Sequence, residues 1–322
     1  MTIQPIFLFS LPRSGSTLVQ RVIAAHEGVA TVSEPWLLLS HAYTFRRTGV
    51  DAEYVHATMV DAIEDFCCEL PGGADEYRRE LHDYVLRLYE RAAGSGARYF
   101  VDKSPYQFVV DEVMQLFPEG KFVFLWRNPL SIVASIMSTW ENARWQPTMY
   151  SEELLVGLPR LIAACRRSGE QSCSVRFEDL VSGDELQWSR LMSYLGIAFE
   201  PDALERFAQV VLNGRMGDPT GVKQYMSLST EPTQKWRSAL ANPLRKEWCR
   251  RYLRILGNDR LAVMGYDGEQ ILDELNSEPA SMRALVPDLG RLIKDVAKEP
   301  IRVRTRNRKL GSPNVIRALL SV

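Results

Sequence analysis

Ile6-Phe-Leu-Phe-Ser-Leu-Pro-Arg-Ser-Gly-Ser-Thr-Leu18 is the stretch that decides how this chain folds. Its apolar residues predict a strand over about 5–9, and a helical pattern follows over about 16–26. The Ser/Gly loop between them lies at a helix N-terminus, where unpaired backbone N–H groups and the positive end of the helix dipole attract anions. Glycine lets the backbone approach an anion closely, hydroxyls add donors, and the arginine neutralises charge. The predicted anion-binding residues are Arg13, Ser14, Gly15, Ser16 and Thr17.

This loop differs from the loop that binds ATP or GTP. That loop reads G-x-x-x-x-G-K-[ST] and places its lysine on the terminal phosphates and its Ser or Thr on magnesium. The first glycine and the lysine are both absent here. A short R-S-G-S match can also be an ordinary polar turn, so the interpretation needs a second signal.

A second strand end carries that signal. Lys121–Trp126 is a continuous apolar run, and Pro129 stands where the first turn of a helix tolerates proline. Arg127 therefore follows a strand directly, and Ser135 lies about two helical turns further along. Because an arginine fork matches phosphate oxygens in bidentate geometry, this segment predicts a second anion site.

Taken together, the two segments resemble the sulfotransferase family, whose members use 3′-phosphoadenosine-5′-phosphosulfate (PAPS). The resemblance rests on a P-R-S-G-[ST]-T loop for the 5′-phosphosulfate, and on R-[ND]-P with a serine eight residues after the arginine for the 3′-phosphate. Val175-Arg-Phe-Glu-Asp-Leu180 resembles the family's [YF]-E-D-L motif, and Lys235-Trp-Arg-Ser-Ala-Leu240 its K-W-x-x-x-L pattern. These ordered matches extend over about residues 5–268. They imply the donor and the reaction, but not the acceptor.

The resemblance also implies catalytic roles. The pattern looks bacterial in type and closer to tyrosylprotein and heparan-type sulfotransferases than to cytosolic small-molecule ones. A glutamate after the second strand is the base in those relatives, which implies this role for Glu34, and a K-[STD]-P lysine that contacts the sulfuryl group implies that role for Lys103. Arg13 completes the predicted catalytic set, since sulfuryl transfer needs a base and fixed cations.

Other roles for these residues stay open. Glu34 could instead cap the next helix or pair with an arginine. Lys103 could be solvated or pair with Asp102, and His41 is the rival base. Phe177 departs from the family, because many relatives have a tyrosine there whose hydroxyl reaches the 3′-phosphate. The stretch 214–235 replaces a glycine-rich R-K-G loop of the cytosolic members, and the candidate nucleotide contacts within it are Lys223, Ser227 and Ser229.

Composition excludes several classes of protein. The 322 residues carry a formal net charge of −1, whereas a general nucleic-acid or membrane-surface binder needs a sustained basic excess. The five cysteines show neither C-x-x-C nor a zinc spacing, so we expect free thiols and no metal site. No apolar run approaches the ~18 residues of a membrane span, and the N-terminus lacks the features of a signal peptide. We therefore expect a cytoplasmic protein.

Strand-like and helical runs alternate along the chain. This alternation predicts an α/β, P-loop-like fold of three layers with a central parallel sheet, whose ligands bind at the C-terminal ends of the strands. Further strands are expected near 29–33, 98–102 and 172–177, and further helices near 106–117, 129–140 and 186–195. Residues 36–96 lack a convincing strand and predict a helical insertion that forms a lid or an acceptor wall.

The C-terminal region departs from the family pattern. We expect one sulfotransferase domain over 1–270 and a basic extension over 271–322. From Ala280 to Val322 the chain has 10 Lys/Arg against 3 Asp/Glu. Such a segment is either an exposed basic arm, an extension packed on the acidic body, or a surface that recognises an acidic acceptor or a carrier protein.

The sequence therefore predicts a PAPS-dependent sulfotransferase that acts, without a metal, on a hydroxyl of a small-molecule, lipid or carbohydrate acceptor. One alternative is a P-loop nucleotide kinase or hydrolase, and another is a non-catalytic nucleotide-binding scaffold. The sequence leaves the oligomeric state open, a homo-oligomer included.

Overall fold

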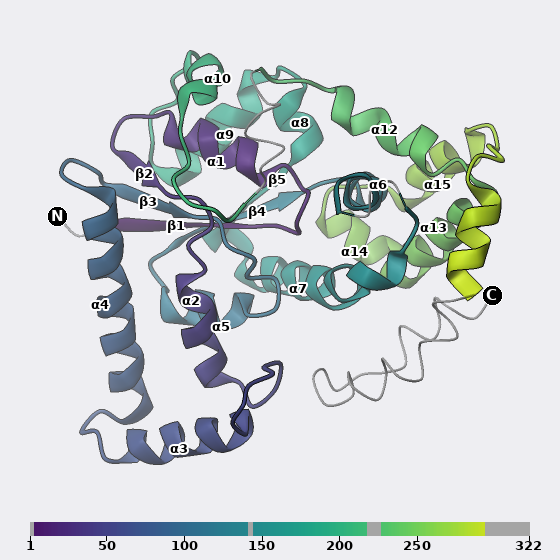
Figure 1. Cartoon of the computed structure of the whole chain (residues 1–322). Coiled ribbons are helices and arrows are strands. Elements are labelled where there is room, and N and C mark those ends of the chain that lie inside the picture. Colours follow the sequence, from purple (N-terminus) through teal and green to yellow (C-terminus); the bar gives the residue numbers. More distant parts are fainter. Residues whose placement is uncertain (1–2, 141–143, 218–226, 294–322) are drawn as a thin grey trace.

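A parallel sheet forms the centre of the molecule (Figure 1). The computed structural model describes residues 3–140, 144–217 and 227–293. Its strands are β1 (Gln4–Phe9), β2 (Val29–Thr31), β3 (Tyr99–Asp102), β4 (Lys121–Trp126) and β5 (Ser172–Arg176). They lie in the order β2-β3-β1-β4-β5, and all pairs are parallel. The predicted α/β fold is confirmed.

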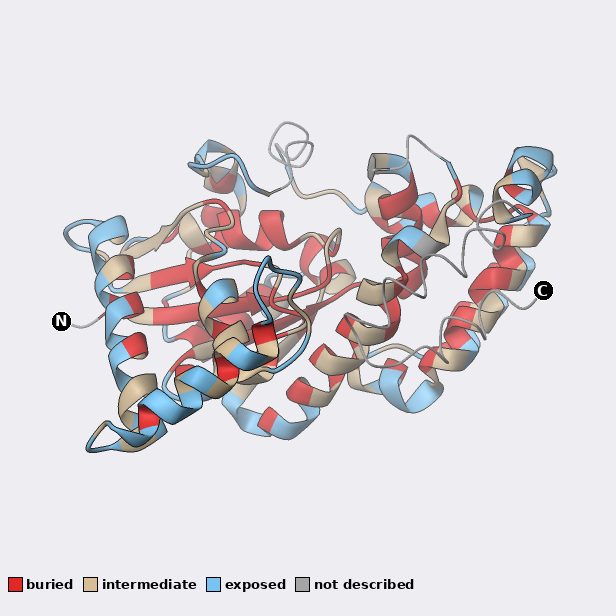
Figure 2. Ribbon diagram, turned by 60° about the horizontal axis from the view of Figure 1, so that its bottom comes forward, coloured by how far each residue is buried: buried red, intermediate tan, exposed pale blue. Residues whose placement is uncertain are grey.

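Both faces of the sheet are buried, as parallel sheets require (Figure 2). Successive side chains of a strand point to opposite faces. In β1, Phe7 and Phe9 therefore enter one hydrophobic cluster, while Ile6 and Leu8 enter the other. The continuous apolar run that predicted this strand is thus explained by two-sided burial.

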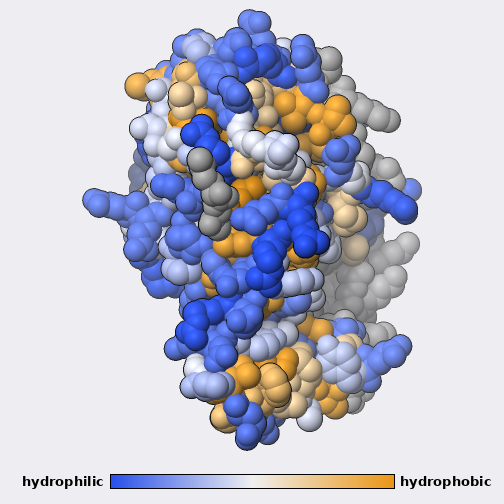
Figure 3. Space-filling view, turned by 90° about the vertical axis from the view of Figure 1, so that its left-hand side faces the viewer, coloured by the Kyte–Doolittle hydropathy of each residue, from blue (hydrophilic) through white to orange (hydrophobic). Residues whose placement is uncertain are grey.

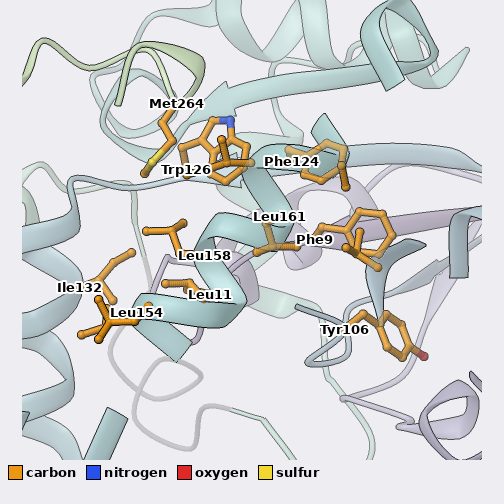
Figure 4. Close-up of a cluster of buried hydrophobic side chains, with 14 of the residues drawn as sticks. Phe9, Leu11, Tyr106, Phe124, Trp126, Ile132, Leu154, Leu158, Leu161 and Met264 are labelled. Atoms are coloured by element: carbon orange, nitrogen blue, oxygen red, sulfur yellow. The ribbon is translucent and has the colours of Figure 1, made fainter. Parts of the chain in front are cut away.

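Helices cover both faces of the sheet, so that the fold has three layers. The first face carries α1 (Ser16–Ala24), α8 (Phe177–Val181) and α9 (Glu185–Leu195). The second carries α4 (Gly73–Ala93), α5 (Val110–Leu116) and α7 (Leu158–Ser168). Figure 4 shows the second core, where Leu158 and Leu161 of α7 approach Phe124 and Trp126 of β4.

The remaining elements lie around this centre. A group of helices packs beyond the β4–β5 side of the sheet: α6 (Pro129–Trp140), α12 (Glu231–Ala239), α13 (Pro243–Leu256), α14 (Asn258–Val263) and α15 (Gly268–Ser277). The short pieces are α10 (Ala203–Arg206), the 3₁₀ turns η2 (Pro147–Tyr150), η4 (Gly169–Gln171) and η5 (Phe207–Gln209), and the π-helical turn η3 (Glu153–Gly157). Ile271 and Leu275 of α15 join the second core, and the boundary at residue 270 stays a prediction.

The expected insertion is helical. Between β2 and β3 the structure describes every residue and contains α2 (Leu37–Ala42), η1 (Tyr43–Phe45), α3 (His56–Cys68) and α4, with no strand. Tyr54, Val55 and Phe66 are exposed near α3, at the end where Figure 3 shows a gathering of apolar side chains. Among the described helices none combines the length and apolar character that crossing a bilayer requires.

Candidate active site

The carboxyl ends of all five strands meet at one edge of the sheet, and the predicted site residues follow them. The loop with Arg13 follows β1, Glu34 follows β2, Lys103 follows β3, and Arg127 follows β4. From β1 the chain crosses toward the β2 edge of the sheet, whereas from β3 and from β4 it crosses toward the β5 edge. Ligands of open α/β sheets bind where the strand order reverses in this way.

The loop after β1 leaves its polar groups available to a ligand. Gly15 precedes α1 with φ +87°, and the helix N-terminus has no side-chain cap. A Cβ at Gly15 would lie 2.2 Å from the ring of Phe177, so a larger residue is excluded by both conformation and space. Ser14 Oγ is buried, and no described residue hydrogen-bonds to it. A phosphate or sulfate oxygen would supply the missing partner, so this cradle fits the 5′ end of PAPS.

Arg127 and Ser135 both contact Arg13. Arg127 is 4% exposed and donates to the Arg13 carbonyl oxygen and to the Pro232 carbonyl oxygen, each at 2.7 Å. Its guanidinium lies 4.8 Å from the centre of the Phe177 ring. Ser135 Oγ accepts a hydrogen bond from Arg13 Nε at 3.2 Å. The two predicted anion sites are therefore one connected cluster of basic groups.

The E-D-L motif fixes the loop after β4. Glu178 accepts from the Asn128 backbone N–H at 3.0 Å and from the Tyr266 hydroxyl at 2.5 Å. Asp179 binds Arg176 through both carboxylate oxygens, at 2.6 and 2.7 Å. These carboxylates hold β5, α8 and the Arg127 loop together, so the motif has a structural role that its sequence pattern alone does not reveal.

Glu34 and Lys103 form an ion pair between two strand ends. Lys103 Nζ donates to Glu34 Oε1, and the side chains are 8% and 19% exposed. Trp36 Nε1 donates to the other oxygen, Oε2, at 3.0 Å. Glu34 therefore does not cap α2, whose N-terminus has no side-chain cap, and its carboxylate binds Lys103 and Trp36. A carboxylate and an ammonium are held side by side.

Asp102, the suggested alternative partner of Lys103, binds hydroxyl groups instead. Its carboxylate is fully buried and accepts from Tyr89 at 2.6 Å and from Ser104 and Tyr106 at 2.7 Å. Burial raises the pKa of Asp102, against the three hydrogen bonds that lower it. Ser104 Oγ in turn accepts from the Trp36 backbone N–H at 3.1 Å, so this network reaches the turn that carries Glu34.

His41 lies away from the predicted chemistry. It is the fifth residue of α2, and its ring makes an edge contact with Tyr84 of α4 at 5.9 Å between centroids. Burial lowers the pKa of His41. It does not line the cavity in which Glu34 and Lys103 lie.

A cavity of about 520 Å³ joins the site residues. Of the predicted residues, its walls include Arg13, Gly15, Ser16, Thr17, Glu34, Lys103 and Arg127. Ser14 and Ser135 do not line it. Sequence reasoning missed several wall residues, which come from the insertion, the loop after β3 and η3: Trp36, Leu39, Tyr43, Gln107, Phe108 and Glu153.

The candidate nucleotide contacts in the stretch 214–235 do not line the cavity among the described residues, although two neighbouring residues do. Lys223 lies outside the described residues. Ser229 Oγ accepts from the Glu231 N–H at 3.2 Å at the start of α12, and Ser227 is exposed. Met216 and Gly217 line the cavity, and the Met216 carbonyl oxygen accepts from Ser33 Oγ. The basic segment 301–309 also lies outside the described residues.

Comparison with known proteins places the chain. The family model described as the sulfotransferase family matches residues 5–201. The chain belongs to the sulfotransferase family. This membership confirms the expected family and supports PAPS as the co-substrate, and with it sulfuryl transfer as the reaction class.

Individual relatives of this sulfotransferase are distant. It is 28% identical over 291 residues to nodulation protein NoeE of Sinorhizobium fredii (strain NBRC 101917 / NGR234), with 81% of this chain and 65% of NoeE covered. It is 23% identical over 209 residues to protein-tyrosine sulfotransferase 2 of Gallus gallus, with 62% and 53% covered. The chain thus spans about two thirds and about half of these curated relatives.

A solved structure agrees with the fold. The sulfotransferase domain from the curacin biosynthetic pathway superposes with a TM-score of 0.53 at 22% identity, covering 81% of this chain and 98% of that domain. No group of three or more His, Cys, Asp and Glu side chains within the described ranges is placed to hold a metal ion. Metal-independent transfer stays a prediction. The five cysteines are free thiols.

Proposed function

We propose that this protein transfers the sulfuryl group of PAPS to a hydroxyl of a small-molecule, lipid or carbohydrate acceptor. The observation that carries the proposal is the Lys103–Glu34 pair in the wall of the cavity that also contains the loop after β1. Sulfuryl transfer needs a base for the hydroxyl proton and cations for the charge that develops on oxygen. The pair offers both groups next to an anion cradle.

The basic cluster holds the donor, which supplies an activated sulfuryl group. Arg13 and the N–H groups at the start of α1 bind the 5′-phosphosulfate, and Ser14 Oγ donates to it. Arg127 and Ser135 serve the 3′-phosphate. Arg127 also fixes the loop, because it holds the Arg13 carbonyl oxygen.

The reaction is an in-line displacement at sulfur. Glu34 accepts the proton of the acceptor hydroxyl as the new bond between the acceptor oxygen and sulfur forms. The bond from sulfur to the 5′-phosphate oxygen breaks, and its electron pair stays on the departing adenosine 3′,5′-bisphosphate (PAP). Lys103 opposes the charge on the sulfuryl oxygens, and Arg13 the charge on the leaving group.

Ligand-dependent stability tests the donor assignment. PAP or PAPS at ~100 times its dissociation constant should raise the free energy of unfolding by roughly 2.7 kcal/mol, and Mg-ATP should do less. Ser14→Ala should weaken PAP binding without lowering the stability of the free protein, because the lost hydroxyl has no partner in it. Ser193→Ala, at an exposed serine of α9, is the matched control. A shift with Mg-ATP alone would overturn the donor assignment.

Transfer is then measured directly. Mass spectrometry should detect a PAPS-dependent gain of one sulfo group on acceptors, and chelation of divalent metals should leave the rate unchanged. PAP binding without transfer to any acceptor would favour the non-catalytic scaffold. The cytoplasmic location and the oligomeric state stay predictions, which fractionation and light scattering address.

A further inference from the structure

The walls of the cavity differ in charge. Arg13, Lys103 and Arg127 line it near the strand ends of β1, β3 and β4. The walls from the loop after β3 and from η3 contribute instead the carboxamide of Gln107 and the carboxylate of Glu153. An anionic donor is favoured at the first set of residues. A hydroxyl group can donate to the side-chain oxygens of this second set, whereas an anionic group has no proton to offer them.

Gln107 has a buried side-chain oxygen that no described residue satisfies. The residue is 4% exposed, and its Oε1 receives no hydrogen bond from any described residue. Leaving such a group unsatisfied costs a protein about 1–3 kcal/mol. Native proteins keep few of these groups, so each one calls for an explanation. A hydroxyl of a bound molecule is the simplest partner for this oxygen, because the residue lines the cavity.

The surroundings of Gln107 are rigid. Gly157 at the end of η3 packs so closely that a Cβ there would lie 2.7 Å from Gln107 Cγ. The next carbonyl oxygen along the chain, that of Phe108, accepts from Arg160 Nη1 at 2.7 Å and also from Arg46. The Cγ atom of Gln107 and the backbone at Phe108 are therefore held in place before any ligand binds. The adjoining π-helical turn is itself a rare geometry that occurs frequently at functional sites.

Aromatic side chains form the rest of this wall. Trp36, Tyr43 and Phe108 line the cavity, together with Leu39. Trp36 is 42% exposed and has φ +54°, a strained value for a residue with a side chain. The Ser104 hydroxyl and the Glu34 carboxylate hold it there. An apolar molecular face can pack on these rings beside the base.

We propose that Gln107 and Glu153 select the acceptor, and that it is a neutral polyhydroxy compound with an apolar face. One hydroxyl reacts at Glu34, a second donates to Gln107 Oε1, and the apolar face packs on Trp36 and Phe108. Glu153 disfavours anionic acceptors. This inference rests on the proposed function.

Three probes separate the acceptor classes. Octyl β-D-glucopyranoside is a neutral polyol, 1-octanol keeps the chain with one hydroxyl, and a tyrosyl peptide flanked by aspartates is anionic. We expect the highest kcat/KM for the glucoside. Gln107→Leu should reduce the preference for the glucoside over octanol by about threefold to tenfold, the value of one hydrogen bond. Glu153→Gln should raise the relative rate of the peptide.

Matched variants distinguish selection from stability. Gln115→Leu on exposed α5 surface and Glu152→Gln beside η3 should leave the preferences unchanged. Gln107→Leu should fold with unchanged or higher stability, since it removes an unsatisfied polar group; a purely structural glutamine would lose stability and keep its preference.

Two failures can be told apart. Absence of PAP binding would refute the proposed function itself. PAP binding with no transfer to the glucoside, with a preferred peptide or octanol, or with preferences that Gln107→Leu leaves unchanged, would refute this inference and leave the donor assignment intact.

Discussion

Replacing Glu34 by glutamine tests the proposed base most directly. Glutamine keeps the shape of the side chain but lacks a basic oxygen. The two carboxylate oxygens of Glu34 accept from Lys103 Nζ and from Trp36 Nε1. A carboxamide has one acceptor oxygen, so its NH₂ group must face one of these two donors. The substitution therefore removes the base and also one hydrogen bond.

The two losses have different magnitudes and different readouts. General-base assistance is worth 10²–10⁴-fold in rate, roughly 3 to 5.5 kcal/mol of barrier. The lost hydrogen bond costs about 1–3 kcal/mol of folding stability where the buried Lys103 is the donor left unsatisfied, and less where it is Trp36, which is 42% exposed. PAP affinity should change little, because the hydrogen bonds that Glu34 accepts come from Lys103 and Trp36 and not from the residues assigned to the nucleotide.

The assay is single-turnover transfer from PAPS, followed by mass spectrometry, on Glu34→Gln and on His41→Ala. Urea unfolding shows that each variant is folded, and calorimetry with PAP shows that the donor site is intact. Trp36→Phe removes one of the two hydrogen bonds to Glu34 and keeps the carboxylate, so it measures the loss of that bond together with the change in the aromatic wall. Near-normal turnover of folded Glu34→Gln, with activity lost in His41→Ala, would refute the reasoning.

Three further predictions follow from other contacts. Gly15→Ala should cost several kcal/mol and abolish PAP binding, because its Cβ meets an aromatic ring at 2.2 Å; Gly183→Ala, with a similar φ of +89° and open space, should cost only about 1–2 kcal/mol in urea unfolding. Arg127→Ala should weaken PAP binding in calorimetry more than it lowers the transfer rate at saturation. It should also lower the free energy of unfolding by about 1–3 kcal/mol for each of the two carbonyl oxygens that lose their donor. Unchanged PAP affinity would contradict the 3′-phosphate role. Burial lowers the pKa of His82, but hydrogen bonds to two carboxylates outweigh burial and raise the pKa above 6.5. The protonated ring therefore stabilises the folded protein below pH 6.5, and this stabilisation is lost as the pH rises through the raised pKa. Burial lowers the pKa of His41, so the folded protein favours its neutral ring and is stabilised by it at high pH. In urea unfolding, His82→Gln should therefore lower the free energy of unfolding more at pH 5.5 than at pH 8.5, and His41→Gln more at pH 8.5 than at pH 5.5.

The sequence predicted the donor side of the site because its signals are local. An apolar run followed by a polar residue marks a strand end, and parallel strands bring such ends to one edge. Glu34 and Lys103 are 69 residues apart, yet each follows its strand closely enough for this rule to place them together. The roles assigned to Arg13, Arg127 and Ser135 in nucleotide binding stay predictions, although these residues do form one cluster.

The acceptor side was not predictable in the same way. Gln107 and Glu153 carry no motif, and their meeting depends on how η3 packs against the loop after β3. The expected helix at 106–117 begins only at Val110, because residues 104–109 form this loop. The expected strand 29–33 ends at Thr31, since Ser33 hydrogen-bonds instead to Asn213 and Met216. Long-range packing of this kind leaves no periodic trace in the sequence.

The long connection between β2 and β3 contributes to the wall that faces the acceptor, whereas the donor is assigned to other segments of the chain. The donor cradle is built from short loops that directly follow the strands. Part of the opposite wall, including Trp36, Leu39 and Tyr43, belongs to an insertion anchored at two strand ends. Substitutions in the segment 36–43 can therefore reshape what the cavity admits while the strands, α4 and the cradle stay as they are. Substitutions confined to this one segment can thus change which acceptors bind, while the residues that bind the donor are kept.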